Sequence, residues 1–144
     1  MCYGGLGQNE TALSIELDVY AKWTALDPSS ERTFCRALNL SVSLVGTGRY
    51  KQAKSFLREQ IAAARRVLGE ETSLVIRLRW NYADALCEDD SASRDDVAEA
   101  VAILEELFRT ARRVLGTAHP ITGGIQESRG TAQETLAAFA PETE

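Results

Sequence analysis

The sequence predicts an all-α fold, a right-handed α-solenoid of antiparallel helix hairpins with about six helices. A hexapeptide, Ala-Arg-Arg-Val-Leu-Gly, occurs at 64–69 and again at 111–116, each time at the end of a long stretch with apolar residues at helical spacing. Only 3 prolines occur in 144 residues, whereas Ala, Leu, Arg and Glu abound, which favours helix over strand. A repeat every roughly 20–50 residues indicates units that bury their apolar faces against their neighbours.

The repeating unit is 42 residues long, and one loop of the later copy is lengthened. Asn39 and Asn81 lie 42 positions apart, as do Leu26 and Leu68. Gly69 and Gly116 lie 47 positions apart, and the five extra residues fall in the polar stretch 88–94. Because three landmarks agree on the register, a repeat array explains the sequence better than a plain helical bundle with a chance match.

The chain is expected to divide into three parts. Residues 1–8 form a short N-terminal segment, the remnant of a preceding helix, and residues 139–144 form a frayed tail. Residues 9–138 form the repeat domain. Its helices are expected at 9–26, 31–46, 49–68, 71–88, 94–115 and 119–138.

The first three helices are predicted from apolar residues three or four positions apart. The first carries a stripe of Ala12, Ile15, Val19, Trp23 and Leu26. The break at 27–30 offers an N-cap to the second helix, whose stripe holds Phe34, Ala37, Leu40 or Ser41, and Leu44. The third follows the glycines at 46–48 and ends at Gly69, with a stripe of Tyr50, Ala53, Leu57, Ile61, Ala64 and Leu68.

The last three helices follow from the same spacing. The fourth carries Leu74, Leu78, Tyr82, Ala85 and Leu86. Ser93 and Asp96 form a capping-box sequence that opens the fifth, whose stripe is Val97, Ala100, Val101, Leu104, Phe108, Ala111 and Leu115. His119-Pro120 opens the sixth, which is weaker because three glycines each cost about 1 kcal/mol relative to alanine. Its apolar side is Ile125, Ala132, Leu136 and Ala137.

Charge, hydropathy and cysteine content disfavour several classes of protein. The net charge of −5 argues against a nucleic-acid partner, because phosphate binding needs a concentrated basic face. No apolar run approaches the roughly 18 residues of a membrane span, and the start has no signal-peptide pattern. An odd number of cysteines (Cys2, Cys35, Cys87) without close spacing is typical of reduced thiols. We therefore expect a cytoplasmic protein that contacts neither nucleic acid nor membrane.

Several short motifs resemble a known family. They are Gly48-Arg49-Tyr50, the hexapeptide at 64–69, Trp80-Asn81-Tyr82-Ala83 and His119-Pro120. Together they resemble the tetratricopeptide repeat, and more narrowly the 42-residue variety found in kinesin light chains, over roughly residues 6–136. The resemblance implies hairpins whose helices approach closely at Ala53 and Ala100, where only a methyl group has room.

The chain also departs from the family's motifs. Thr72-Ser73 stands in place of the family's His-Pro pair, and 95–97 in place of Gly-Arg-Tyr. Ser128-Arg129-Gly130 replaces Asn-Leu-Ala and puts an arginine where the family buries a leucine. We therefore expect the final helix to be an end cap facing water, or a decayed repeat.

The resemblance implies a concave groove, lined by the first helix of each hairpin, that holds an extended peptide or a partner helix. Its positions fall on Cys35, Leu38, Asn39 and Val42, on Arg77, Trp80, Asn81 and Asp84, and on Glu127, Ser128 and Thr131. An asparagine amide pairs with a peptide backbone, Arg77 suits a carboxylate, and Trp80 suits an interface anchor. Each has a structural alternative: Asn81 as a bond between helices, Trp80 as core, and Arg77 as a solvated charge.

Catalytic and metal chemistry find little support in the sequence. His119 is the only histidine, and beside Pro120 it suits a helix start. Cys35, Cys87 and His119 lack metal-ligand spacing, and no glycine-rich phosphate loop follows a strand. We therefore expect no enzymatic activity, no cofactor and no bound metal.

The sequence thus predicts a non-catalytic interaction module that binds a peptide or helix of a partner protein. The alternative is a structural fragment of a longer scaffold, which packs end to end or self-associates through exposed repeat ends. The short segment 1–8 favours this alternative, because it stands where a first helix would be.

Overall fold

The computed structural model describes the backbone of residues 6–27 and 30–139, and side chains from residue 10 onward within those ranges. This part of the chain consists of six α-helices and contains no strand. The helices are α1 (Leu6–Leu26), α2 (Glu31–Gly46), α3 (Tyr50–Leu68), α4 (Ser73–Glu88), α5 (Arg94–Val114) and α6 (Pro120–Ala138). Helix α1 therefore begins three residues before the expected start, and the all-α solenoid predicted from the sequence is confirmed.

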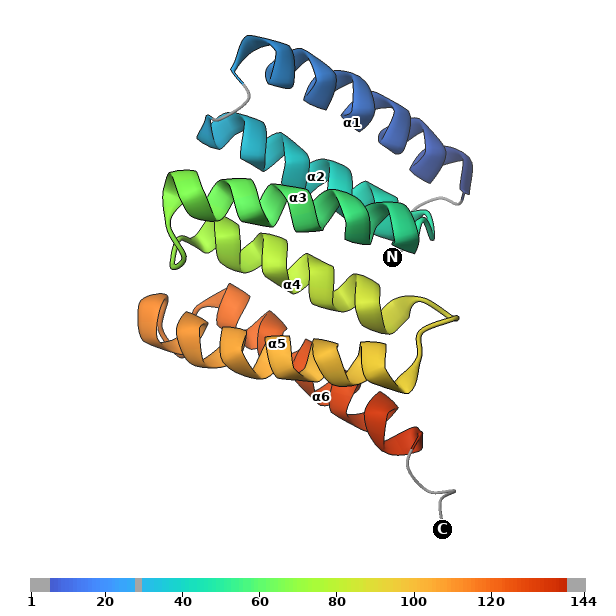
Figure 1. Cartoon of the computed structure of the whole chain (residues 1–144), viewed down its shortest axis with the longest axis vertical. Helices are drawn as coiled ribbons and strands as arrows, with labels where there is room; N and C mark the ends of the chain where they lie inside the picture. Colours follow the sequence, from blue (N-terminus) through green and yellow to red (C-terminus); the bar gives the residue numbers. More distant parts are fainter. Residues whose placement is uncertain (1–5, 28–29, 140–144) are drawn as a thin grey trace.

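The helices stack in chain order as antiparallel neighbours (Figure 1). Each helix packs on the next, and α4 also contacts both α2 and α6. In the described residues the backbones of α1 and α3, and those of α3 and α5, do not approach closely, although the Tyr20 side chain of α1 reaches α3. The even-numbered helices therefore form a closely packed layer, here called the inner layer, and the odd-numbered helices form a more open outer layer.

The starts of the three inner helices show the repeat most clearly. Ser30, Thr72 and His119 are their N-caps, and each accepts a hydrogen bond from a backbone N–H of the first turn. They are separated by 42 and 47 positions, as the register requires. These caps satisfy N–H groups that have no partner within the helix. Thr72 thus performs with its hydroxyl the capping that His119 performs with a ring nitrogen.

The ends of the outer helices repeat as well. Gly69 and Gly116 follow α3 and α5 with φ of 90° and 99°, a region that residues with a Cβ rarely adopt. The predicted capping box of Ser93 and Asp96 at the start of α5 is confirmed in both directions. The duplicated hexapeptide therefore marks two equivalent helix ends.

Two clusters of buried apolar side chains form the core between the layers. Phe34, Leu57, Leu78 and Leu104 are each at most 1% exposed. Ala53 and Ala100 are completely buried, as expected for positions at which two helices approach closely. The predicted stripes of α2 to α5 all lie on this core or at its edge.

The predicted stripe of α1 is wrong as a core face. Ile15 is 56% exposed and Leu26 is 77% exposed, whereas Leu13, outside the predicted stripe, is 5% exposed. The side of α1 that packs also carries Tyr20, whose ring meets Phe56 edge-on at 5.2 Å. Helix α1 has apolar residues on two sides, so periodicity alone could not identify the side that packs.

Arg129, which stands where the family buries a leucine, packs against α5. Its side chain is partly buried, and its guanidinium lies 4.5 Å from the centre of the Phe108 ring on α5. The Nε atom is buried without a hydrogen bond, so the stacking holds this group in place. At the position where the family buries a leucine, this chain therefore packs a flat guanidinium on an aromatic ring.

Candidate functional site

The three inner helices present equivalent positions along one face. Asn39, Asn81 and Ser128 are the ninth residues of α2, α4 and α6. Two hollows lie along this layer, one between α2 and α4 and one between α4 and α6. Helix α4 contributes Trp80 and Asp84 to both, so its inner side is the ridge between them.

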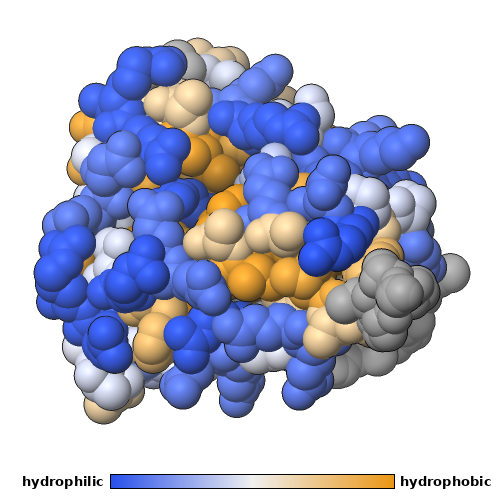
Figure 2. Space-filling model, turned by 60° about the horizontal axis from the view of Figure 1, so that its bottom comes forward, coloured by the Kyte–Doolittle hydropathy of each residue, from blue (hydrophilic) through white to orange (hydrophobic). Residues whose placement is uncertain are grey.

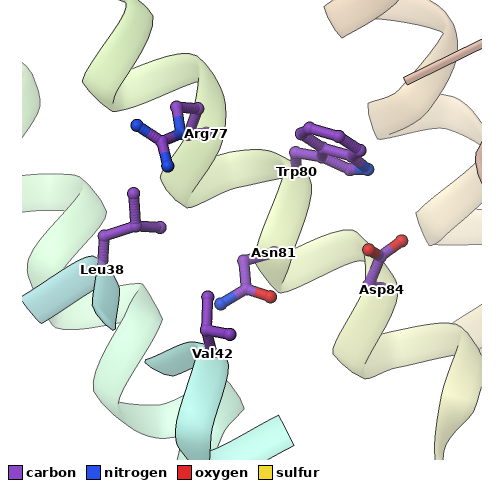
Figure 3. Close-up of a pocket in the computed structure, with 6 residues that line it drawn as sticks. All are labelled: Leu38, Val42, Arg77, Trp80, Asn81 and Asp84. Atoms are coloured by element: carbon purple, nitrogen blue, oxygen red, sulfur yellow. The ribbon is translucent and has the colours of Figure 1, made fainter. Parts of the chain in front are cut away.

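The α2–α4 hollow has a volume of about 200 Å³. It is lined by Leu38, Val42, Arg77, Trp80, Asn81 and Asp84. In Figure 3, Arg77 and Asn81 extend toward α2, whereas Trp80 and Asp84 lie on the side away from it. Val42 is 55% exposed, so the hollow offers an apolar surface beside an exposed guanidinium.

Asn81 joins two inner helices. Its Nδ2 donates to the hydroxyl of Ser41 on α2, which in turn donates to the carbonyl of Leu38 at 2.7 Å. Ser41 is completely buried, so this chain of bonds satisfies a hydroxyl that would otherwise be costly. The structural role considered for Asn81 is therefore present, and its Oδ1 makes no described hydrogen bond.

The α4–α6 hollow is larger, about 390 Å³. Its walls are Trp80, Asp84, Cys87 and Glu88 from α4 and Gly124, Glu127, Ser128, Thr131 and Ala132 from α6. The Trp80 indole N–H donates to the Ser128 hydroxyl at 2.9 Å. A Cβ on Gly124 would overlap the Trp80 ring, so the glycine is what lets the ring lie against α6.

Trp80 is therefore neither a core residue nor a free anchor. It is half-buried, and its indole connects α4 to α6. The Trp80 side chain also lines both hollows. Interface anchors are commonly tryptophans that are already held in one orientation, because little entropy is lost on binding.

Among the carboxyl groups of the site, that of Asp84 has the pKa that departs most from its ordinary value. Its partly buried position raises its pKa from 3.8 to about 7, nearby Glu88 adds to the rise, and a hydrogen bond with Ser128 partly offsets it. Burial, together with Asp84 and Glu88, raises the pKa of the Cys87 thiol to about 11. The Cys87 thiol is therefore protonated at neutral pH and is a poor nucleophile.

Nine of the eleven predicted groove residues line the two hollows. Cys35 and Asn39 line neither, although both lie on α2. Leu38 is only 4% exposed, so it forms the floor and offers little surface. Sequence reasoning missed Gly124, Cys87 and Glu88. The register offered a signal for Gly124, because it occupies the position equivalent to Arg77 and Cys35.

In residues 6–27 and 30–139 no cluster of His, Cys, Asp and Glu side chains is placed to hold a metal ion. Cys35 and Cys87 are free thiols, and Cys2 lies outside the described residues. Among the described helices none has the length and apolar character needed to cross a membrane.

Comparison with known proteins identifies the repeat. The family model for the tetratricopeptide repeat matches residues 36–72 and 91–121. The first match covers most of α2 and all of α3, and the second covers all of α5. Neither the curated proteins nor the solved structures gave a match.

Proposed function

Since this chain is a tetratricopeptide repeat protein, a fold that generally serves protein interaction, we propose that it binds a peptide or helix of a partner protein along the inner layer. The observation that carries this proposal is the pair of hollows that α2, α4 and α6 form. Together they present Val42, Arg77 and Trp80 as an apolar, a cationic and an aromatic contact. We further propose that the role is non-catalytic.

The repeat variety and the compartment belong to the same proposal. The 42-residue spacing of the caps Ser30 and Thr72 supports the kinesin-light-chain-like variety. The free thiols of Cys35 and Cys87 suit a reducing compartment such as the cytoplasm.

The test compares matched double variants on the two layers. Val42→Ser with Arg77→Ala alters the inner layer, and Val67→Ser with Arg109→Ala makes the same changes on the outer helices α3 and α5. All four side chains are exposed, so neither variant is expected to disturb the core. Asn81 is left intact because it bonds Ser41.

The full chain and both variants are used to capture partners from native lysate, and any captured protein is then titrated in purified form. We expect the inner-layer variant to lose at least tenfold in affinity and the outer-layer variant to bind as the unaltered chain does. Equal binding by the inner-layer variant would remove the hollows from the binding site.

A second candidate is a structural unit that packs end to end with other copies. The specific observation in its favour is the uncovered stripe on α1, where Ile15 and Leu26 are largely exposed. Figure 2, which brings the α5–α6 end of the stack forward, shows an apolar area in the middle of that end as well. Apolar surface at both ends of a repeat array is what end-to-end packing requires.

Sedimentation velocity over a range of concentrations separates the two candidates. A packing unit grows in size with concentration, and Ile15→Ser with Leu26→Ser abolishes that growth. An interaction module remains a monodisperse monomer at every concentration. Val67→Ser on α3 is the control for a general loss of surface hydrophobicity.

A further inference from the structure

Charge is distributed unevenly between the two hollows of the inner layer. The α2–α4 hollow contains Arg77, whereas no lysine or arginine lines the α4–α6 hollow. That hollow instead carries the carboxyl groups of Asp84, Glu88 and Glu127. None of these three carboxyl groups takes part in the ion pairs of the described residues. The hollow is therefore acidic and has no cation of its own.

The aromatic wall of the same hollow also lacks a cation. Elsewhere in the described chain an arginine stacks on Trp23, on Tyr82 and on Phe108. Trp80 has no such arginine, although tryptophan is the aromatic side chain that attracts cations most strongly. Its indole is fixed by Ser128 and by the gap at Gly124, so its orientation is set before any ligand arrives.

We propose that the α4–α6 hollow receives a lysine or arginine side chain of the bound partner, held between Trp80 and the carboxyl groups of Asp84, Glu88 and Glu127. This inference rests on the proposed function, because it names the chemistry of the segment that the inner layer holds. Sites for whole small molecules occupy about 300–1,000 Å³. At about 390 Å³ the hollow is at the small end of that range and suits one long side chain.

The neighbouring hollow gives the bound segment a direction. Arg77 and the acidic hollow lie on opposite sides of the α4 ridge. A partner that crosses this ridge therefore carries its basic residue over α6 and an acidic or polar residue over Arg77. Opposite charges in a fixed order select both the partner and its orientation.

The titration of Asp84 agrees with this geometry. In the α4–α6 hollow the titratable groups beside Asp84 are Cys87 and Glu88 from α4 and Glu127 from α6. In the α2–α4 hollow the charged group is Arg77 of α4, and α2 contributes no ionisable side chain to the lining. Burial, and after it the nearby carboxylate of Glu88, raises the pKa of Asp84 to about 7, although a hydrogen bond with Ser128 partly offsets the rise. A bound cation displaces the proton of this carboxyl group, so binding strengthens as the pH rises through 7.

The test uses the full chain labelled with ¹⁵N and small probes of known charge. The probes are N-acetyl-arginine methylamide, N-acetyl-lysine methylamide and, as a neutral probe of similar length, N-acetyl-norleucine methylamide. The readout is the indole N–H resonance of Trp80, which Trp23→Phe distinguishes from the second tryptophan. We expect the two cationic probes to give a saturable shift at pH 8 that weakens at least threefold at pH 5.5.

Matched variants separate the hollow from overall charge. Asp84→Asn with Glu127→Gln removes two charges from the hollow, and Glu59→Gln with Glu99→Gln removes two from the exposed outer helices. We expect the first pair to weaken binding at least fivefold and the second to leave it unchanged. Glu127→Gln alone, at an exposed position, gives a smaller loss without any effect on folding.

Four results would overturn the inference, of which the first three concern the blocked amino acids and the variants. These three are a norleucine shift equal to the arginine shift, no loss of binding in the Asp84 and Glu127 variant, and no saturable shift with any probe. Tighter binding of spermidine than of either blocked amino acid would also overturn it, in favour of a free polycation. Partner capture that depends on Val42 and Arg77 but not on Asp84 and Glu127 would leave the proposed function standing and reject only this inference.

Discussion

Gly124 and Gly123 are adjacent glycines of α6 that should respond in opposite directions to the same substitution. A Cβ on Gly123 would meet nothing within 4 Å. A Cβ on Gly124 would overlap the Trp80 ring and would lie 2.8 Å from its Cζ2. Real Cβ atoms do not come this close to another atom, so Trp80 has to move away from α6.

The magnitudes decide the sign of each effect. Alanine stabilises a helix interior by about 1 kcal/mol relative to glycine. At position 123 nothing opposes this gain, so Gly123→Ala should raise the free energy of unfolding by about 0.5–1 kcal/mol. At position 124 overpacking costs about 1–3 kcal/mol. Loss of the hydrogen bond between Trp80 and Ser128 costs about 1 kcal/mol more, which offsets the gain in helix propensity, so Gly124→Ala should destabilise the protein by about 1–3 kcal/mol.

Urea unfolding followed by far-UV circular dichroism measures both free energies. Tryptophan emission of the folded protein, with Trp23→Phe as background, reports whether Trp80 has moved. We expect the two variants to differ by at least about 1.5 kcal/mol and only Gly124→Ala to change the emission. Equal stabilisation by both substitutions with unchanged emission would show that Trp80 does not lie against Gly124.

Three further predictions concern the core, a helix start and the titration of Asp84. Ala100→Leu should destabilise the protein by about 1–3 kcal/mol in urea unfolding, because Ala100 is completely buried, whereas Ala102→Leu at an exposed position of α5 should not. Ser93→Ala should cost about 1 kcal/mol through loss of the capping box, and a Tm equal to that of the unaltered chain would contradict this. Asp84 binds its proton more tightly when folded, so the free energy of unfolding should fall from about pH 4 to pH 7, by an amount on the order of 1–3 kcal/mol, and then level off. Asp84→Asn should remove most of that fall and be the more stable form at pH 8; a pH profile identical to that of the unaltered chain would refute the raised pKa.

The repeat register was predictable because the residues that mark it end or cap a helix through contacts within a few positions of the chain. Gly69 and Gly116 end helices whatever lies around them, and Ser93 with Asp96 caps its own first turn. Such signals depend on a few neighbouring residues, so one sequence suffices to interpret them. The same reasoning places Asn39 and Asn81 at matching positions, and the structure agrees.

The face of α1 was not predictable for the opposite reason. This helix carries Leu13 on one side and Ile15 on another, and both spacings are helical. Which side packs is decided by the shape of α2 and by Phe56 on α3, with which Tyr20 makes its ring contact. Periodicity reports that a helix has an apolar side, but tertiary contacts decide which of two such sides is covered.

The candidate site was only partly predictable. The register located Arg77, Trp80 and Asp84 on one helix, but it could not reveal that Trp80 bonds Ser128 across to α6. That contact depends on the absent side chain of Gly124, and a glycine in a sequence is more often taken for weak helix propensity than for space. The raised pKa of Asp84 likewise depends on burial, which no spacing encodes.

Mapping a bound partner on the protein by NMR tests the central claim most directly. The ¹⁵N-labelled full chain is titrated with the purified segment of a captured partner, and backbone shifts are assigned to helices. Binding along the inner layer predicts the largest shifts on α2, α4 and α6, centred on Arg77 and Trp80. Shifts confined to the outer helices α1, α3 and α5 would contradict the claim that the inner layer is where this protein holds its partner.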